Sequence, residues 1–259
     1  MLKKRLVGVI TVKDGLAVQS FGYRKYLPMG RPDILAENLD RWGADEIILQ
    51  CINRSRQHSG PDFALLEQVA SKGLSTPLIY SGGIHSVEEG VAVIQSGADR
   101  ICLDALLHDA PEIAVALSEC LGSQALIAAL PLSVEPDGLV WLDYRTGHRS
   151  PLSPALLDVF RVGALSEALI IDWRHEGFPC GFDMSLLSHF PLSEIPLIAF
   201  GGLSEGAQLR EALQSSRVVA TAVGNFLSYR EQAVALYKQQ LGGLPIREPY
   251  NDYFPQGEL

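Results

Sequence analysis

Three carboxylates lie at or just after apolar runs of the kind that form buried strands. Asp104 ends the run RICLD, Asp172 ends ALIID, and Glu176 follows four residues later. A carboxylate in such a place can give or take a proton in general acid–base catalysis. These three are the candidate catalytic residues. The simpler interpretation, which we favour for each, is a solvated loop carboxylate, because a sequence does not show which groups have perturbed pKa values.

A Gly-Gly pair occurs twice in nearly the same context. The stretch TPLIYSGGI at 76–84 returns 119 residues later as IPLIAFGGL at 195–203. Glycine lets backbone N–H groups approach a ligand closely, and a following helix N-terminus adds partial positive charge. Ser86 and Ser204 suit those helix starts as N-caps. Both features favour phosphate, and the predicted phosphate-binding residues are Gly82, Gly83, Gly201, Gly202, Gly224 and Asn225. The alternative is that each pair only makes a tight turn.

Charge and cysteine spacing exclude several classes of function. A net charge of −9 with scattered Lys and Arg argues against nucleic acid or an anionic membrane as partner. No apolar run approaches the roughly 18 residues of a membrane span. The cysteines lie far apart, which predicts reduced thiols in a cytoplasmic protein, with Cys51 and Cys102 inert in the core. No histidine pairing suggests a metal site, and we expect no cofactor.

The elements that must position these residues follow one another as eight β-then-α units. The predicted strands are 6–12, 46–52, 77–80, 100–104, 125–130, 168–172, 196–200 and 218–223. The predicted helices are 33–42, 62–72, 86–96, 111–121, 154–162, 184–190, 205–214 and 229–241. Most strands are apolar on both faces, which predicts a parallel sheet covered by helices. Eight such units predict an α/β protein with a closed (β/α)₈ TIM barrel, and an open doubly wound sheet is the alternative.

Internal repeats at a spacing near 120 residues indicate that the barrel consists of two tandem halves. Gly82-Gly83 precedes Gly201-Gly202 by 119 residues, and Gly43-Ala44 precedes Gly163-Ala164 by 120. We therefore predict a single domain over residues 1–259, with half-barrels at about 1–121 and 122–245 and a C-terminal tail at 246–259.

Several motifs give the chain a resemblance to a known family. They are VKDG at 12–15, GADEI at 43–47, GGIH at 82–85, GADR at 97–100, GSQA at 122–125, G-x-x-x-G-x-D at 177–183 and YRE at 229–231. With the two half-barrels, they resemble HisF, the cyclase subunit of imidazole glycerol phosphate synthase, over residues 5–231. The resemblance implies a (β/α)₈ barrel that receives ammonia from a glutaminase, HisH, and cyclises a ribulose-linked nucleotide bearing two phosphates.

The resemblance also shows where this chain departs from the family. It implies one catalytic aspartate at the end of strand one and another at the end of strand five, and these positions hold Thr11 and Pro131. Neither side chain exchanges a proton near neutral pH, so we expect weak or absent cyclase activity. Phe200 replaces a serine before the second Gly-Gly, and Asp104 replaces an asparagine, which disfavours phosphate. Glu176 occupies a family aspartate position.

The opposite end of the barrel keeps the family pattern. The resemblance implies four charged residues that gate the entry of ammonia, and the matching positions hold Arg5, Glu46, Arg100 and Glu167. Asp99 matches a position at the glutaminase interface. The alternative is a ring that serves only the stability of the fold, although burying such a ring offers little net stability.

Three functions remain open from the sequence. The first is a subunit that docks a HisH-like glutaminase as a heterodimer and conducts ammonia to a third enzyme, for amidation of a surface-polysaccharide sugar. The second is a cyclase of histidine biosynthesis that uses other acids. The third is a non-catalytic barrel that acts as a scaffold or regulator.

Overall fold

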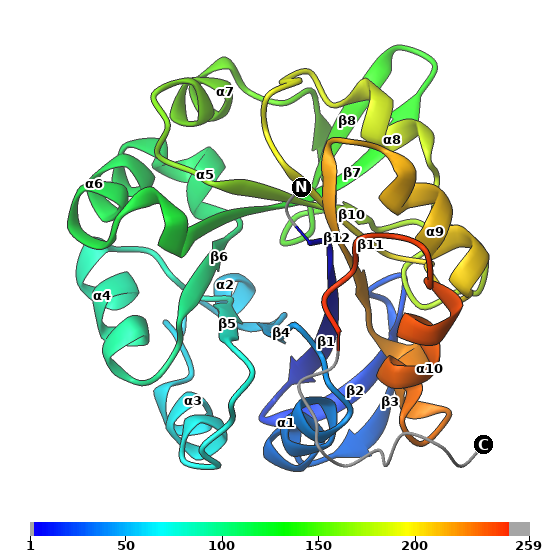
Figure 1. The fold of residues 1–259 in the computed structure, drawn as a ribbon. Helices are drawn as coiled ribbons and strands as arrows, with labels where there is room; N and C mark the ends of the chain where they lie inside the picture. Colours follow the sequence, from blue (N-terminus) through cyan, green and yellow to red (C-terminus); the bar gives the residue numbers. More distant parts are fainter. Residues whose placement is uncertain (1–2, 249–259) are drawn as a thin grey trace.

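The computed structural model describes residues 3–248, and within them eight parallel strands close into a barrel surrounded by helices (Figure 1). The order around the barrel is β10-β11-β12-β1-β4-β5-β6-β7, and β7 pairs with β10 to complete the circle. The predicted (β/α)₈ barrel is therefore confirmed. Its strands are β1 (Arg5–Lys13), β4 (Glu46–Cys51), β5 (Leu78–Ser81), β6 (Arg100–Leu103), β7 (Leu126–Glu135), β10 (Glu167–Asp172), β11 (Leu197–Phe200) and β12 (Val218–Val223).

Helices cover the outside of the barrel and connect its strands (Figure 1). The outer helices are α1 (Pro32–Arg41), α3 (Phe63–Ala70), α4 (Val87–Gln95), α6 (Pro111–Leu121), α7 (Pro154–Arg161), α8 (Ser185–His189), α9 (Gly206–Gln214) and α10 (Ala233–Gln240). Shorter helical segments lie in the connections: α2 (Arg54–Gln57), α5 (Leu106–Asp109), η1 (Ser123–Ala125) and η2 (Asn225–Ser228).

Side-chain alternation along the strands creates two apolar clusters. On β1, Leu6 and Ile10 point outward into a large core between strands and helices, whereas Val7 and Val9 point into the barrel. The interior cluster draws on all eight barrel strands and contains residues such as Ile48, Cys102 and Ile171. Because both faces are buried, the strands lack polar alternation, as expected for a parallel barrel.

Two antiparallel hairpins extend the barrel beyond the C-terminal ends of its strands. The hairpin β2–β3 (Leu16–Phe21 and Lys25–Gly30) continues from β1, and β8–β9 (Gly138–Asp143 and His148–Ser150) continues from β7. The two strands that carry hairpins are the first of each predicted half. The sequence-based assignment missed both hairpins, which build the walls of the mouth described below.

Two helix starts test the predicted N-caps. The Ser86 side chain accepts a hydrogen bond from the Glu89 N–H at 3.2 Å, so this cap is confirmed. The prediction for Ser204 is wrong: α9 has Glu205 as its N-cap residue, with no side-chain cap bond. The Ser204 hydroxyl instead accepts from the Cys180 N–H at 2.9 Å.

No helix in residues 3–248 is both long and apolar enough to cross a membrane.

The tail predicted at 246–259 falls outside the described residues from 249 onward. Its first residues join the barrel, since Ile246 bridges to Lys4 and the Arg247 N–H donates to the Lys4 carbonyl at 3.0 Å.

Candidate functional site

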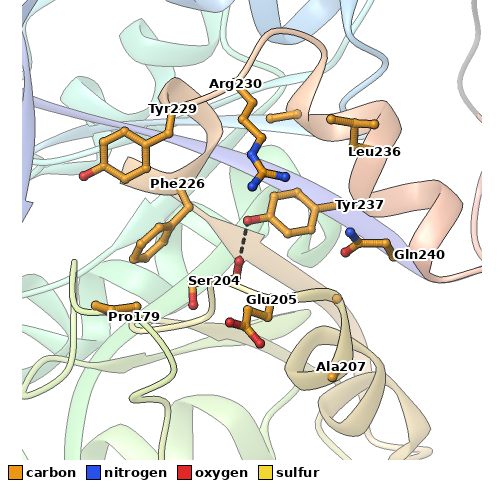
Figure 2. A pocket seen from close by; sticks show the side chains of 12 residues that line it. Pro179, Ser204, Glu205, Ala207, Phe226, Tyr229, Arg230, Leu236, Tyr237 and Gln240 are labelled. Carbon is orange, nitrogen blue, oxygen red and sulfur yellow. Dashed lines mark hydrogen bonds between the residues drawn. The ribbon is translucent and has the colours of Figure 1, made fainter.

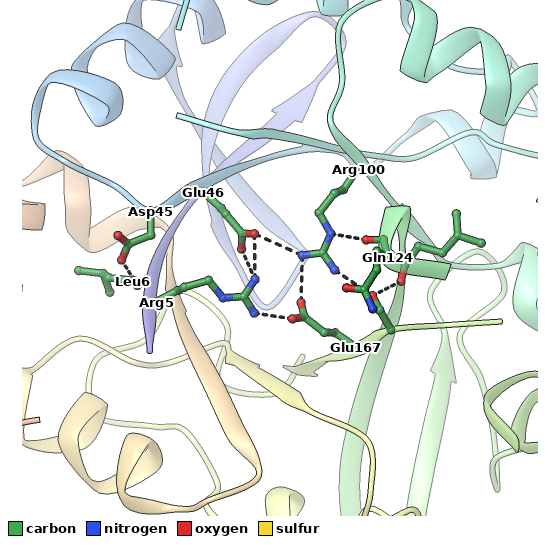
Figure 3. Close-up of polar contacts among 9 residues, drawn as sticks. Arg5, Leu6, Asp45, Glu46, Arg100, Gln124 and Glu167 are labelled. Atoms are coloured by element: carbon green, nitrogen blue, oxygen red, sulfur yellow. Dashed lines mark hydrogen bonds and ion pairs between the residues drawn. The ribbon is translucent and has the colours of Figure 1, made fainter. Parts of the chain in front are cut away.

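Four charged side chains at the N-terminal ends of the strands form a closed ring (Figure 3). Arg5 donates to both carboxylate oxygens of Glu46, at 2.8 and 2.9 Å, and to Glu167 at 2.6 Å. Arg100 completes the circle with bonds to Glu167 at 3.0 Å and to Glu46 at 3.3 Å. Each guanidinium thus touches both carboxylates, and the ring has no formal net charge.

The ring is largely buried, and residues outside it also hydrogen-bond to Arg100. The side chains of Arg5 and Glu46 are 9% and 7% exposed. Burial alone would lower the pKa of Arg5, but the carboxylates of Glu46 and Glu167 outweigh it, so the net shift is upward. Arg100 also donates to the Gln124 carbonyl and the Ser166 hydroxyl, both at 2.9 Å. The ring therefore closes the N-terminal end of the barrel with groups that are fixed by several hydrogen bonds each.

Between this ring and the other end, the interior is lined by apolar side chains. Its one thiol, Cys102, has a raised pKa because of burial. Burial likewise raises the pKa of the Cys51 thiol, on the outer face, to about 12. Both thiols are neutral at physiological pH and are not nucleophiles. An interior of this kind disfavours any ion but not a small neutral molecule.

A cavity of about 660 Å³ opens at the C-terminal ends of the strands. Alternation places Pro131 on the interior face, with Ile127 and Ala129, and Pro131 lines this cavity. Thr11 shares the interior face of β1 with Val7 and Val9 and is 5% exposed. The two positions that the family resemblance assigned to catalysis thus stand on the inside of the barrel, on strands β1 and β7, without a titratable group.

Asp104 is the one carboxylate among the residues that line this cavity. It accepts a hydrogen bond from the Ser55 hydroxyl at 3.0 Å and another from the Tyr144 hydroxyl. Burial, and then the Asp104 charge, raise the pKa of Tyr144, which keeps the phenol protonated as a donor. Tyr144 comes from the hairpin β8–β9 and Ser55 from α2, so three separate connections meet at this carboxylate.

The other two candidate catalytic carboxylates hold loops in place and do not line the mouth cavity. Asp172 is 1% exposed, pairs with His175 Nδ1 at 2.7 Å and accepts from the Asp183 N–H at 2.8 Å. Glu176 is 2% exposed and accepts from the Ser20 hydroxyl at 2.9 Å and the Tyr23 N–H at 3.2 Å. Burial raises the pKa of Glu176, and these hydrogen bonds only partly offset it.

Backbone packing already accounts for the first Gly-Gly pair. A Cβ on Gly82 would lie 2.2 Å from the Cys51 carbonyl oxygen, and one on Gly83 would lie 2.4 Å from the Gly60 carbonyl oxygen. The Gly83 N–H donates to the Ser55 hydroxyl at 2.9 Å. Both glycines therefore pack closely against backbone, Gly82 against the end of β4 and Gly83 against the loop that carries α2.

The second Gly-Gly pair has a similar environment. A Cβ on Gly201 would lie 2.5 Å from the Asp172 carbonyl oxygen, and one on Gly202 would lie 2.8 Å from the Phe182 nitrogen. Beyond the pair, the Ser204 carbonyl accepts from the Tyr237 hydroxyl at 2.6 Å, beside a hollow of about 550 Å³ between α9 and α10 (Figure 2).

The residues after β12 also make protein contacts. A Cβ on Gly224 would meet the Phe200 ring at 3.5 Å. Asn225 binds the backbone of Ser20 through both side-chain atoms, accepting at 3.1 Å and donating at 2.6 Å. Phosphate binding at the six predicted residues stays a prediction, and the two glycine pairs and Asn225 have structural roles without it.

Two aromatic side chains occupy one side of the mouth. Phe200 lies in the interior cluster, 3% exposed, and Tyr23 packs against that cluster from hairpin β2–β3. The Tyr23 hydroxyl donates to Gln50 Oε1 at 3.2 Å, and burial raises the Tyr23 pKa well above its ordinary value. Among the described residues, the cavity is lined by those on or after β1, β4, β5, β6, β7 and β10, and by none from β11 or β12.

Sequence reasoning missed most of the cavity wall. Tyr23, Tyr144 and Trp173 line the cavity, as do the cations Lys13, Arg24, Arg56, Arg145 and Arg149. Most of them lie on the two unpredicted hairpins, so no strand-end pattern pointed to them.

Asp99, the predicted interface residue, is exposed at the ring end and accepts from the Leu78 N–H at 2.8 Å. Within residues 3–248, no cluster of His, Cys, Asp or Glu is arranged to hold a metal ion.

Comparisons with known proteins agree with this architecture. The model of the family described as "Histidine biosynthesis protein" matches residues 5–233. The imidazole glycerol phosphate synthase subunit HisF of Thermococcus gammatolerans is 29% identical over 257 residues, which cover 96% of this chain and 100% of that protein. The HisF subunit of Staphylococcus aureus (strain Newman) is 28% identical over 254 residues, covering 95% and 100%. That of Geobacillus kaustophilus is 28% identical over 250 residues, covering 93% and 97%. Because the family match spans most of its length, the chain belongs to the histidine biosynthesis protein family and is a homologue of HisF.

Proposed function

We propose that this barrel docks a HisH-like glutaminase at its charged ring and conducts ammonia to its mouth, without acting as a cyclase. The ammonia then serves the amidation of a surface-polysaccharide sugar by a third enzyme. The observation that carries the proposal is the contrast between the two ends of the barrel. The complete ring of Arg5, Glu46, Arg100 and Glu167 persists at one end, while Thr11 and Pro131 leave the other end without its acid–base pair.

The ring suits a gate because its bonds are unequal. The Arg100–Glu46 contact, at 3.3 Å, is longer than the Arg5–Glu46 contact at 2.8 Å and the Arg5–Glu167 contact at 2.6 Å. Arg100 keeps its bonds to Gln124 and Ser166 when it leaves Glu46. Opening at this pair costs the fewest strong hydrogen bonds, so we place the entry of ammonia between Arg100 and Glu46.

The interior supports conduction of neutral ammonia. An ammonium ion would lose its hydration among the apolar side chains of the interior cluster without gaining a counter-ion. Ammonia carries no charge and avoids this cost. Asp99 lies exposed beside Arg100 and supports docking of the glutaminase at this face.

The structure of the mouth favours this proposal over a cyclase. General acid–base catalysis contributes typically 10²–10⁴-fold for a positioned group, and the two strand ends concerned hold none. Phe200 and Tyr23 occupy the side of the mouth near β11 and β12, where one end of a two-phosphate substrate would bind. Asp104 is the remaining carboxylate in the cavity and is the candidate for any acid–base step. The four free cysteines support a cytoplasmic location.

The proposal is tested with the chain and the HisH-type glutaminase of the same organism, in an extract that supplies the acceptor. Glutamine labelled with ¹⁵N in its amide is added together with excess unlabelled ammonium. If the wild-type barrel conducts the ammonia released from glutamine, the product is enriched in ¹⁵N. In Arg5→Ala and Glu46→Ala, the ¹⁵N fraction of the product should fall toward that of the ammonium in solution. The control is Arg161→Ala, which removes an exposed arginine whose one ion-pair partner among residues 3–248 is Asp158.

Two other outcomes decide between the alternatives. If both ring variants keep the ¹⁵N enrichment of the wild type, the ring only stabilises the fold and the conduit proposal fails. If the chain stimulates the glutaminase but no ¹⁵N reaches any product, the non-catalytic scaffold or regulator is the better account.

A further inference from the structure

A second hollow, of about 870 Å³, lies beside the mouth, between hairpin β2–β3, the segment after β10 and the segment η2. Its wall contains five aromatic side chains, among them Trp173, Phe178 and Tyr229, and three cations, Arg24, Lys25 and Arg174. Within residues 3–248, no carboxylate belongs to this wall. We call it the aromatic hollow. A wall of this composition is unusual for a protein whose net charge is −9.

Two aromatic rings of the hollow are about half exposed, and each packs against a second ring. Phe178 is 48% exposed and Tyr229 is 54% exposed. Phe178 packs against Phe21 at 6.0 Å between ring centroids, and Tyr229 packs edge-on against Phe226 at 5.7 Å. Tyr229 and Phe226 lie close together where this hollow borders the one between α9 and α10 (Figure 2). Exposed but positioned rings of this kind are platforms for stacking a planar group.

The cations of the hollow lack enough carboxylates to neutralise them. Arg24 and Lys25 have no ion-pair partner in the part of the chain that the structure describes. Arg174 shares the single carboxylate of Glu135 with Arg149, at 2.6 and 3.2 Å. The hollow therefore carries a local positive charge, and arginine forks match the geometry of phosphate oxygens.

The indole N–H of Trp173 is a second, independent observation, because it lacks a hydrogen-bond acceptor among the described residues. The residue is 7% exposed, and its Nε1–H is buried without a hydrogen-bond partner among the described residues. Its ring lies under the guanidinium groups of Arg174 and Arg149, at 5.4 and 5.8 Å from the centroid. Trp173 and Arg24 line both the aromatic hollow and the mouth cavity, so these two side chains lie where the two spaces meet.

We infer that the aromatic hollow binds a nucleoside diphosphate. The base stacks on Phe178 and Tyr229, and the phosphate oxygens accept from Arg24, Arg174 and the Trp173 indole. A group attached to the second phosphate would extend past Trp173 into the mouth, toward Asp104. This site goes beyond the ammonia conduit and depends on none of the ring residues, so the two proposals fail independently.

The test is titration calorimetry of the isolated chain at low salt with ADP and UDP, and with adenosine and pyrophosphate as half-ligands. We expect at least one diphosphate to bind about tenfold or more tightly than either half-ligand, because stacking and phosphate contacts each contribute. Phe178→Ala and Arg174→Gln should each weaken that binding by about tenfold, and added salt should weaken it further. Both side chains are exposed, so the variants should fold.

Trp173→Phe keeps an aromatic ring and removes the indole N–H, so it isolates the contribution of that hydrogen-bond donor to binding. Arg161→Gln is the control for loss of a positive charge elsewhere. Binding that is unchanged in Phe178→Ala, or pyrophosphate that binds as tightly as the nucleotides, would overturn the inference. The absence of binding by both nucleotides to the folded wild type would also overturn it.

Discussion

Gly83 allows two interpretations, a phosphate-binding residue or a residue in a tightly packed turn, and the residue type alone does not distinguish them. In the sequence, a Gly-Gly pair before a helix predicts a phosphate site. In the structure, Gly83 has φ +76°, donates its N–H to Ser55 and faces the Gly60 carbonyl. The pair is explained by close passage of the loop that carries α2, a contact between segments that a sequence pattern does not show.

A matched pair of glycines tests this interpretation. Gly83 and Gly163 share φ +76°, but a Cβ on Gly163 would meet nothing within 4 Å. Both Gly→Ala changes carry the left-handed backbone cost of about 1–2 kcal/mol. Gly83→Ala should lose a further 1–3 kcal/mol, roughly the cost of overpacking, as measured by urea unfolding. Equal losses would mean that packing against the Gly60 carbonyl does not require glycine at position 83.

At the scale of elements, the barrel could be predicted and the hairpins could not. Each barrel strand lies within a few residues of its predicted range, because apolar β-branched runs alternate with amphipathic helices of ordinary length. The strand β3 (Lys25–Gly30) contains Pro28 and is mostly exposed, so no alternation marks it. The helices α2 and α5 span four residues each, too few to show a helical period.

The hairpins matter because they carry the side chains of the mouth. Tyr23 and Tyr144 reach Gln50 and Asp104, respectively, across large distances in sequence. Neither contact follows from spacing along the chain. The four ring residues, by contrast, sit at strand starts, so a correct strand assignment together with the family resemblance located them. The predicted site was therefore most complete where regular strands carry it and least complete where loops do.

Glu176 fastens hairpin β2–β3 to the barrel, and this gives a pH-dependent prediction. Burial raises its pKa above the ordinary glutamate value of 4.5. Between that value and the higher native pKa, the folded protein binds more protons than the unfolded one, so stability falls as pH rises through this window. Glu176→Gln stays neutral and keeps an acceptor for Ser20, and it should remove this dependence.

Thermal unfolding of wild type and Glu176→Gln at about pH 5 and about pH 8 provides the measurement. The variant should gain stability relative to wild type at the higher pH. Glu119→Gln, on the exposed face of α6, is the control for loss of one negative charge. A variant that is destabilised more at the higher pH than at the lower would show that the ionised carboxylate stabilises the hairpin.

At the scale of the whole molecule, the barrel has two ends with different chemistry. One end is a largely buried ring of two arginines and two glutamates, and the other is a cavity that the described residues line with cations, aromatic rings and one carboxylate. An apolar interior separates them. In the proposed function, ammonia enters at the ring, and Thr11 and Pro131 at the other end supply no acid–base group.

The most direct test of this account is the cyclase activity of the isolated chain with the ribulose-linked nucleotide of the family and excess ammonium. Ammonium bypasses the glutaminase, so the assay reports only on the mouth. With HisF of Geobacillus kaustophilus as the reference, we predict turnover at least about 10⁴-fold lower, from the two missing acid–base groups. Turnover within about tenfold of the reference, from a sample shown to be folded, would mean that other residues perform the acid–base steps. The chain would then be a cyclase and not a conduit alone.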